Sequence, residues 1–282
     1  MIGRRAALPA ALAALGVAAA GCGGGGGSPA PPTIAPAKVY KLDWEGPQSV
    51  AEPGRTTLRF AVRTPDGKVL KRFRTGAGPH TGVHLIIVRD DLSQIVHKHP
   101  PIPASGQLAL PVDLPRAGHY HVLVDVYPAS GPLRNFQLTH ELQVGTGNVK
   151  APLPPYAPIV HAGGLTFRVA KLPGLRLAEP ASMIVDVTDA AGKPVAFTPF
   201  YGALAHAIFF RAGSLDYFHS HICGNDPACT AGFGTPATTG HSTKPGRMEL
   251  GILLPASGRW RLFLQVFHKG KLITAPFTLR VQ

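Results

Sequence analysis

Cysteine, methionine and acidic residues are scarce in this chain of 282 residues. It contains three Cys and three Met, and its 15 Asp and Glu are outnumbered by 28 Lys and Arg, which gives a formal net charge of +13. Only Met183 and Met248 lie beyond the first residue. Thioether ligands suit Cu(I), so the sequence argues against a methionine-rich Cu(I) site.

The chain also lacks the motifs that mark several large enzyme classes. GxSxG, HExxH, P-loop and GxGxxG motifs in the required context are missing, so hydrolase and nucleotide-binding functions have no motif support. The aromatic-plus-basic pattern of nucleic-acid modules is missing as well, and we expect no nucleic-acid partner. The positive charge instead indicates a solvated surface, attracted to anionic envelope polymers or lipid head groups.

The first 21 residues have the composition of an export signal. Arg4 and Arg5 precede an apolar run over residues 6–20 that is short for a membrane-spanning helix. Residues 19–22, AAGC, resemble a bacterial lipobox, which implies cleavage before Cys22 and a lipid on its sulfur. Residues 22–38, rich in Gly and Pro, then form a tether. We predict a lipoprotein on the outer face of the cytoplasmic membrane; a secreted protein cleaved elsewhere is the alternative.

Histidines, by contrast, are plentiful and follow a repeated pattern. Residues 84–100 read HLIIVRDDLSQIVHKHP, and residues 206–221 read HAIFFRAGSLDYFHSH. In each copy one His precedes a His-x-His pair by thirteen residues and an Arg by five. Short β-branched runs around a turn predict a β-hairpin in each copy.

The hairpin geometry gives this spacing a chemical meaning. Turns centred on residues 90–91 and 212–213 pair His84 with His97 and His206 with His219, and opposed residues share a face of the sheet. Three imidazoles per hairpin then converge, which predicts a transition-metal site in each copy. The candidate ligands are His84, His97 and His99 in the first copy, and His206, His219 and His221 in the second. Purely structural histidines that bridge strands by hydrogen bonds are the alternative.

Three further histidines are candidates for the first site. His80 lies four residues before His84 in a Gly-rich segment, from which it can swing inward. His119 and His121 form another His-x-His pair that the second copy replaces with arginines. They extend the first site, or they simply face outward on a half-exposed strand.

Cys223 and Cys229 flank the short loop CGNDPAC. In an oxidising compartment such a pair forms a disulfide. Cys223 also alternates with His219 and His221 along one strand, so a thiolate ligand is the alternative.

Turn signals and short alternating runs predict an all-β fold. The motifs AEPGRTTLRFAVRTPDGKVL and AEPASMIVDVTDAAGKPV open two copies of one unit, and a Gly-led strand follows each hairpin. About seven strands per copy indicate two tandem immunoglobulin-like antiparallel β-sandwich domains. We place them at residues 39–146 and 159–282, with a linker at 147–158 and a surface-loop insertion at 224–245.

The two histidine motifs resemble those of a family of bacterial secreted and lipid-anchored proteins with tandem immunoglobulin-like domains. Members carry HLIVVRDDL…HLHP followed by GALGHLV…LHVHP; here the second motif ends HSHIC instead. The resemblance implies no established activity, but it suggests envelope handling of copper or another transition metal, with the six hairpin histidines as ligands.

Together these features predict an extracytoplasmic lipoprotein that binds a transition metal for buffering or delivery, and not an enzyme. Imidazole ligands favour copper, with zinc as the alternative. An envelope protein is a further expected partner. A non-catalytic surface interaction protein with structural histidines is the competing hypothesis.

Overall fold

The computed structural model describes residues 39–131, 133–230 and 238–282. The predicted leader, Cys22 and the tether lie outside these residues. The all-β prediction is confirmed, since strands dominate and α1 (Pro227–Thr230) is the one helix in the described part. None of the described helical residues forms a segment long and apolar enough to span a membrane.

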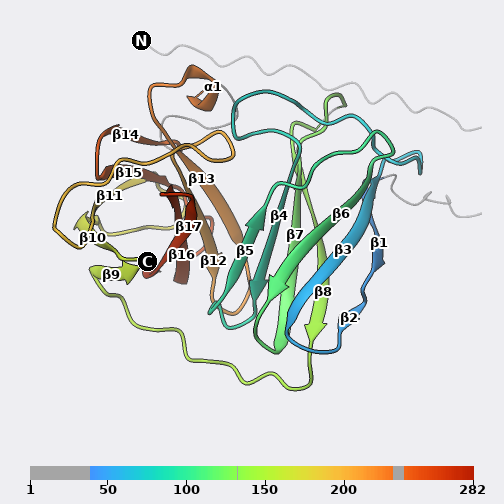
Figure 1. Ribbon diagram of the computed structural model, residues 1–282, viewed down its shortest axis with the longest axis horizontal. Coiled ribbons are helices and arrows are strands. Elements are labelled where there is room, and N and C mark those ends of the chain that lie inside the picture. Colours follow the sequence, from blue (N-terminus) through green and yellow to red (C-terminus); the bar gives the residue numbers. More distant parts are fainter. Residues whose placement is uncertain (1–38, 132, 231–237) are drawn as a thin grey trace, which may run out of the picture. The chain divides into compact units, whose positions relative to one another are not determined.

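The first half of the described chain contains two sheets (Figure 1). One sheet has the order β1-β3-β6, and the other has the order β2-β8-β7-β4-β5. Their bounds are β1 Lys41–Gly46, β2 Ser49–Val50, β3 Gly54–Arg63, β4 Val83–Arg89, β5 Ile95–Lys98, β6 Gln107–Leu114, β7 Gly118–Val126 and β8 Phe136–Val144. Alternate residues of both sheets, such as Phe60 and Ile87, bury one common core. The two sheets therefore pack face to face as a sandwich.

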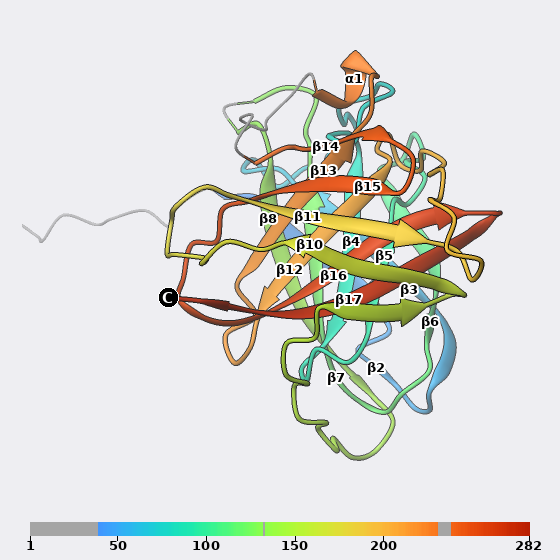
Figure 2. The same cartoon turned by 90° about the vertical axis from the view of Figure 1, so that its left-hand side faces the viewer.

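The second half forms one hydrogen-bonded sheet of nine strands, in the order β17-β16-β12-β13-β14-β15-β11-β10-β9 (Figure 2). Their bounds are β9 Ile159–Ala162, β10 Leu165–Lys171, β11 Ala181–Thr188, β12 Ala205–Arg211, β13 Tyr217–Cys223, β14 Gly240–Lys244, β15 Arg247–Ile252, β16 Gly258–His268 and β17 Lys271–Val281. The sheet encloses its own core, around Phe167, Phe209 and Trp260. Met183 and Met248 are fully buried in this core.

The segment predicted as a surface loop at residues 224–245 contains a strand, so that prediction is wrong in its last part. β14 pairs with β13 and with β15 and joins the two sides of the sheet. Gly240 permits the close approach, because a Cβ atom there would lie 2.4 Å from the carbonyl oxygen of Glu249. Residues 231–237 lie outside the described residues.

An arginine–glycine contact recurs in both halves and explains two features of the repeat. Arg89 donates hydrogen bonds to the carbonyl of Ala117, and its guanidinium covers Gly118, the first residue of β7. Arg211 likewise donates to the carbonyl of Ser257, directly before Gly258, the first residue of β16. The repeated arginine thus fastens each hairpin to the Gly-led strand beside it. Arg89 also pairs with Asp91, and Arg211 with Asp216.

A third apolar cluster joins the two halves. It combines Ile86, Val88 and Leu123 with Ile208, Phe210 and Phe263, all of them buried. These residues come from β4 and β7 on one side and from β12 and β16 on the other. Residues 38–282 accordingly form one compact unit, in which no strand lies between Val144 and Ile159.

Candidate functional site

Both histidine hairpins form, but each predicted pairing is wrong by two residues. Ile86 lies opposite His97, so His84 is level with His99, and their rings stack at 4.0 Å. In the second hairpin His206 lies opposite His221. Since a slip of two residues preserves the face to which a side chain points, the histidines still share one face of each hairpin.

The turns explain the shift. Each loop has four residues, closed by hydrogen bonds from Arg89 N to Gln94 O at 3.1 Å and from Arg211 N to Asp216 O at 2.9 Å. Each loop places a leucine, Leu92 or Leu215, at positive φ, and both leucines pack into the cluster that joins the two halves. Each loop is thus longer than the two-residue turn expected from the sequence, and its leucine packs in the apolar cluster between the halves.

The hairpins do not form two separate sites. Their histidine faces are turned toward each other, and all six imidazoles meet in one cluster. The rings of His97 and His206 are 5.0 Å apart, those of His97 and His219 are 5.1 Å apart, and those of His84 and His219 are 5.5 Å apart. The three histidines expected in the second site lie together. The first hairpin does not form a separate site, because the two sheet faces that carry the histidines pack against each other and His219 joins His84 and His97.

Two overlapping groups of three histidines have the spacing of metal ligands. One is His84, His97 and His219, and the other is His206, His219 and His221; within each group the ligand atoms lie within 4.8 Å of one another. The first group draws on both halves. In the second, Nδ1 of His206 and Nε2 of His219 are 3.2 Å apart. Two nitrogens bound at about 2.0–2.1 Å to one tetrahedral ion are about 3.3 Å apart.

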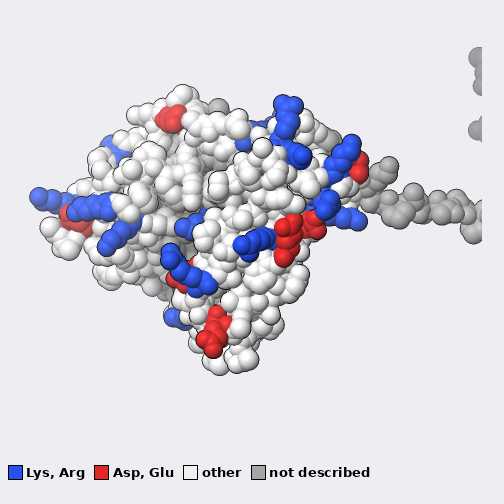
Figure 3. All heavy atoms as spheres, turned by 45° about the vertical axis from the view of Figure 1, so that its right-hand side comes forward, with Lys and Arg blue, Asp and Glu red and all other residues white. Residues whose placement is uncertain are grey.

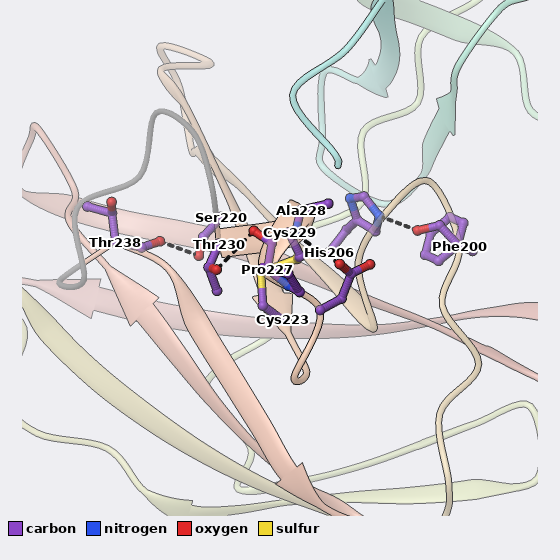
Figure 4. Close-up of a disulfide and its surroundings, with 10 residues drawn as sticks. Phe200, His206, Ser220, Cys223, Pro227, Ala228, Cys229, Thr230 and Thr238 are labelled. Atoms are coloured by element: carbon purple, nitrogen blue, oxygen red, sulfur yellow. Dashed lines mark hydrogen bonds between the residues drawn. A yellow bond between two sulfur atoms is a disulfide. The ribbon is translucent and has the colours of Figure 1, made fainter. Parts of the chain in front are cut away.

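Three of these histidines are oriented by acceptors outside the cluster. His84 donates from Nε2 to the carbonyl of Pro79 at 2.7 Å, and His206 donates from Nε2 to the carbonyl of Phe200 at 3.0 Å (Figure 4). Nδ1 of His97 lies 3.1 Å from Oε1 of Gln265. A histidine ligand usually donates its second ring N–H in this way, which leaves the other nitrogen for the metal.

Five other ring nitrogens of the cluster are buried and have no acceptor or donor among the described residues. The buried atoms without a partner are His84 Nδ1, His97 Nε2, His99 Nε2, His219 Nδ1 and His221 Nε2. A buried polar atom left unpaired costs about 1–3 kcal/mol. The cluster therefore holds five nitrogens whose burial a metal ion is able to offset.

Burial keeps the imidazoles neutral. It lowers the pKa of His84 to about 3 and that of His206 to about 4. Burial lowers the pKa of the other four, His97, His99, His219 and His221, below the usual range as well, and neighbouring imidazoles add to the effect. Neutral imidazole is the form that binds metal, so the cluster is in its ligand form at neutral pH.

The further candidate histidines divide into two groups. His80 joins the cluster, with its ring 4.7 Å from that of His221. His119 and His121 lie near the start of β7, six and four residues before Asp125, which is level with His84. At about 3.3 Å per residue, that places His119 about 20 Å along the strand. His121 instead lies 2.5 Å from a carboxylate oxygen of Glu141.

The structure pairs Cys223 with Cys229 in a disulfide, with the Cα atoms 5.6 Å apart (Figure 4). Both residues are buried, with Ala203 beside them. In this state neither sulfur is a thiolate, so the ligand set consists of imidazoles.

Two residues beside the cluster were missed by the sequence analysis. Asp125 on β7 lies opposite His84, and Gln265 on β16 lies opposite His206. Both are at most 2% exposed. Burial raises the pKa of Asp125 to about 6, against the effect of hydrogen bonds from Asn135 and Tyr127. The signal was present: each is the seventh residue after the glycine that opens its strand, and a polar residue in an apolar run.

The described residues thus define an all-β protein with a buried histidine cluster between two sheet faces. Residues 160–282 match a family model described as a domain of unknown function (DUF8832). This match covers less than half of the chain. No curated protein matches the sequence.

Similar solved structures are distant. Native alpha-2-macroglobulin of E. coli is 12% identical over 88% of this chain, with a TM-score of 0.27, and the chain spans 14% of that protein's length. The Ig1-2 module of the Drosophila receptor protein tyrosine phosphatase DLAR is 11% identical, over 86% of this chain and 99% of that one, with a TM-score of 0.23. A chimeric titin Z1Z2 is 14% identical, over 86% and 98% of the two chains, with a TM-score of 0.22. Scores this low support no statement about function.

Proposed function

We propose that this protein binds a transition-metal ion, copper first and zinc as the alternative, in the single histidine cluster. Its role is buffering or delivery of the ion in the cell envelope, and the ion is cargo. The export signal and the lipobox-like Cys22 supply the cellular context. In this proposal the two halves are tandem immunoglobulin-like domains, and the ion lies where they meet.

The observation that carries the proposal is the set of five buried ring nitrogens without a partner. A structural role for the histidines leaves these atoms unpaired and their desolvation uncompensated. A metal ion at either group of three satisfies several of them at once. The acceptors at Pro79, Phe200 and Gln265 then act as outer partners that fix each ring.

The ligand chemistry favours copper(II) or zinc. Imidazole suits both ions, and Cu(II) has the highest affinity in the divalent series. Soft ligands are excluded from the cluster, because Met183 and Met248 lie in the core of the second half and the described cysteines form a disulfide.

The face drawn in Figure 3 has no concentrated basic patch for a macromolecular ligand. On the face drawn in Figure 3, Lys and Arg are scattered, and acidic residues lie beside several of them. The competing hypothesis is a surface interaction protein with structural histidines. It differs from the proposal mainly because it predicts no stabilisation of the fold by metal.

Thermal unfolding of the chelator-stripped chain of residues 39–282, with and without Cu(II) or Zn(II), tests the proposal. At a metal concentration of 100 times Kd we expect stabilisation of about 2.7 kcal/mol, or about 5–10 °C in Tm. His219→Ala removes a member of both groups of three and should remove most of this shift, and His97→Ala removes a member of one group and should remove part of it. His119→Ala is the matched control, because His119 is exposed and distant from the cluster. Absence of a shift with both metals would favour the structural hypothesis.

A further inference from the structure

A pocket of about 250 Å³ adjoins the histidine cluster on one side. It is lined by residues of both halves, among them Asp125 and Tyr127 from the first and Tyr217, His219 and His221 from the second. The Tyr217 hydroxyl, His219 Nδ1 and His221 Nε2 are buried there without a hydrogen-bond partner among the described residues. The pocket therefore lies against two candidate metal ligands, His219 and His221, and is large enough for a small hydrated ion.

The two sides of the cluster carry different residues at equivalent positions. Asp125 lies opposite His84, and Gln265 lies opposite His206. Gln265 is 1% exposed and contacts His97 and Thr274, and it does not line this pocket. Asp125 does, and it is the one carboxylate among the pocket's described lining residues. The acid therefore lies on the side of the cluster that has the pocket.

Asp125 is held in place within this pocket. The Tyr127 hydroxyl donates to Oδ2 and Asn135 Nδ2 donates to Oδ1, each at 3.3 Å. Both contacts are long, and neither brings a formal positive charge to the carboxylate. A buried carboxylate without a cation beside it is a favourable position for one.

We propose that this pocket is the passage through which a hydrated divalent cation reaches the cluster, with the Asp125 carboxylate as its first protein ligand. The carboxylate replaces one water of the incoming ion, and His219 and His221 then replace the carboxylate and further waters. No electron is transferred. The chain has a formal net charge of +13, which repels cations, so a local anion at the pocket raises their concentration where it is needed. This inference rests on the proposed metal binding.

Stopped-flow absorbance with aqueous Cu(II) alone tests the role of Asp125. A ligand that the ion contacts only in transit speeds both its binding and its release. Asp125→Asn should therefore lower the association and dissociation rate constants about tenfold each and leave Kd within about threefold. Asp125→Glu keeps the carboxylate and should largely retain the association rate. Asp113→Asn, at an exposed acid on β6, is the matched control and should leave both rates unchanged.

The outcomes separate this inference from the proposed function. An unchanged association rate in Asp125→Asn would overturn the passage. A higher Kd with an unchanged association rate would also overturn it, because Asp125 would then hold the bound ion rather than admit it. If the unsubstituted chain gives no absorbance change with Cu(II), the metal proposal fails and the passage fails with it. Unfolding midpoints of the variants without metal that are no lower than that of the unsubstituted chain exclude misfolding as the cause.

Discussion

Nδ1 of His97 lies 3.1 Å from Oε1 of Gln265, a residue 168 positions further along the chain. The contact joins a hairpin of the first half to a strand of the second, and both side chains are buried. It fixes the ring so that Nε2 of His97, which has no partner among the described residues, is the nitrogen left for a ligand. One half of the molecule therefore orients a candidate ligand that the other half carries.

Replacement of Gln265 tests this relationship. Gln265→Leu removes the acceptor, so His97 loses its preferred ring orientation and metal affinity should fall about 10- to 100-fold. A competition titration with a chromogenic chelator measures the change in Kd. Gln107→Leu, at an exposed glutamine on β6, should have no effect. A Kd within twofold of the unsubstituted chain for Gln265→Leu would contradict an orienting role.

The arginine–glycine contact predicts a graded effect on stability. Gly118 has φ +140°, and a Cβ atom there would lie 2.7 Å from the Arg89 guanidinium, so Gly118→Ala should destabilise the fold by about 2 kcal/mol. Gly258→Ala should cost less, because the nearest Arg211 atom would be 3.2 Å away.

Gly174→Ala is the control for both substitutions, since nothing lies within 4 Å of a Cβ atom at that position and its φ is not in the left-handed region. It should be neutral or slightly stabilising. Urea unfolding midpoints give the order. Equal midpoints for Gly118→Ala and Gly174→Ala would show that the Arg89 contact does not require the absence of a Cβ atom at residue 118.

The histidine cluster predicts that the metal-free protein loses stability as the pH falls below 6.5. Burial lowers the folded-state pKa of the cluster histidines, to about 3 for His84 and about 4 for His206. The unfolded chain binds protons near pH 6.5 and the folded chain does not, so the free energy of unfolding decreases toward acid. At pH 5 each such histidine contributes a loss of about 2 kcal/mol.

Burial raises the pKa of Asp125 to about 6, so this carboxyl group adds stability as the pH falls. The net effect is still a loss of stability, because one carboxyl group opposes several histidines. Urea unfolding between pH 7.5 and 5 measures the sum. His84→Leu should reduce the loss of unfolding free energy at pH 5 by about 2 kcal/mol, the contribution of one histidine. A free energy of unfolding that stays constant over this range would mean that the cluster is hydrated and not buried.

Much of the fold follows from local pattern. Alternation of apolar residues along β3, β6 and β11 is enough to predict strands, and the repeated glycines and arginines mark the same unit twice. The faces of the hairpin histidines are also predictable, although the register is not. Leu92 and Leu215 lengthen both loops by packing into the contact between the halves, and no local signal reveals that contact.

The site itself depends on which sheet faces pack together. Each hairpin alone predicts three histidines on one face, but their convergence into one cluster is a tertiary relationship between segments about 120 residues apart. The roles of Asp125 and Gln265 depend on that convergence as well. Their matching positions after Gly118 and Gly258 mark them as special only when the two copies are aligned strand by strand.

In the proposed function, both hairpins serve one metal site. Equilibrium dialysis of the residue 39–282 chain against Cu(II), followed by elemental analysis, measures the number of tightly bound ions per chain. We predict one ion. His219→Ala in the second half removes a member of both groups of three and should abolish tight binding, and His97→Ala in the first half removes a member of one group and should weaken it. Two ions per chain, with each substitution removing only one, would contradict the single cluster, and none would contradict metal binding.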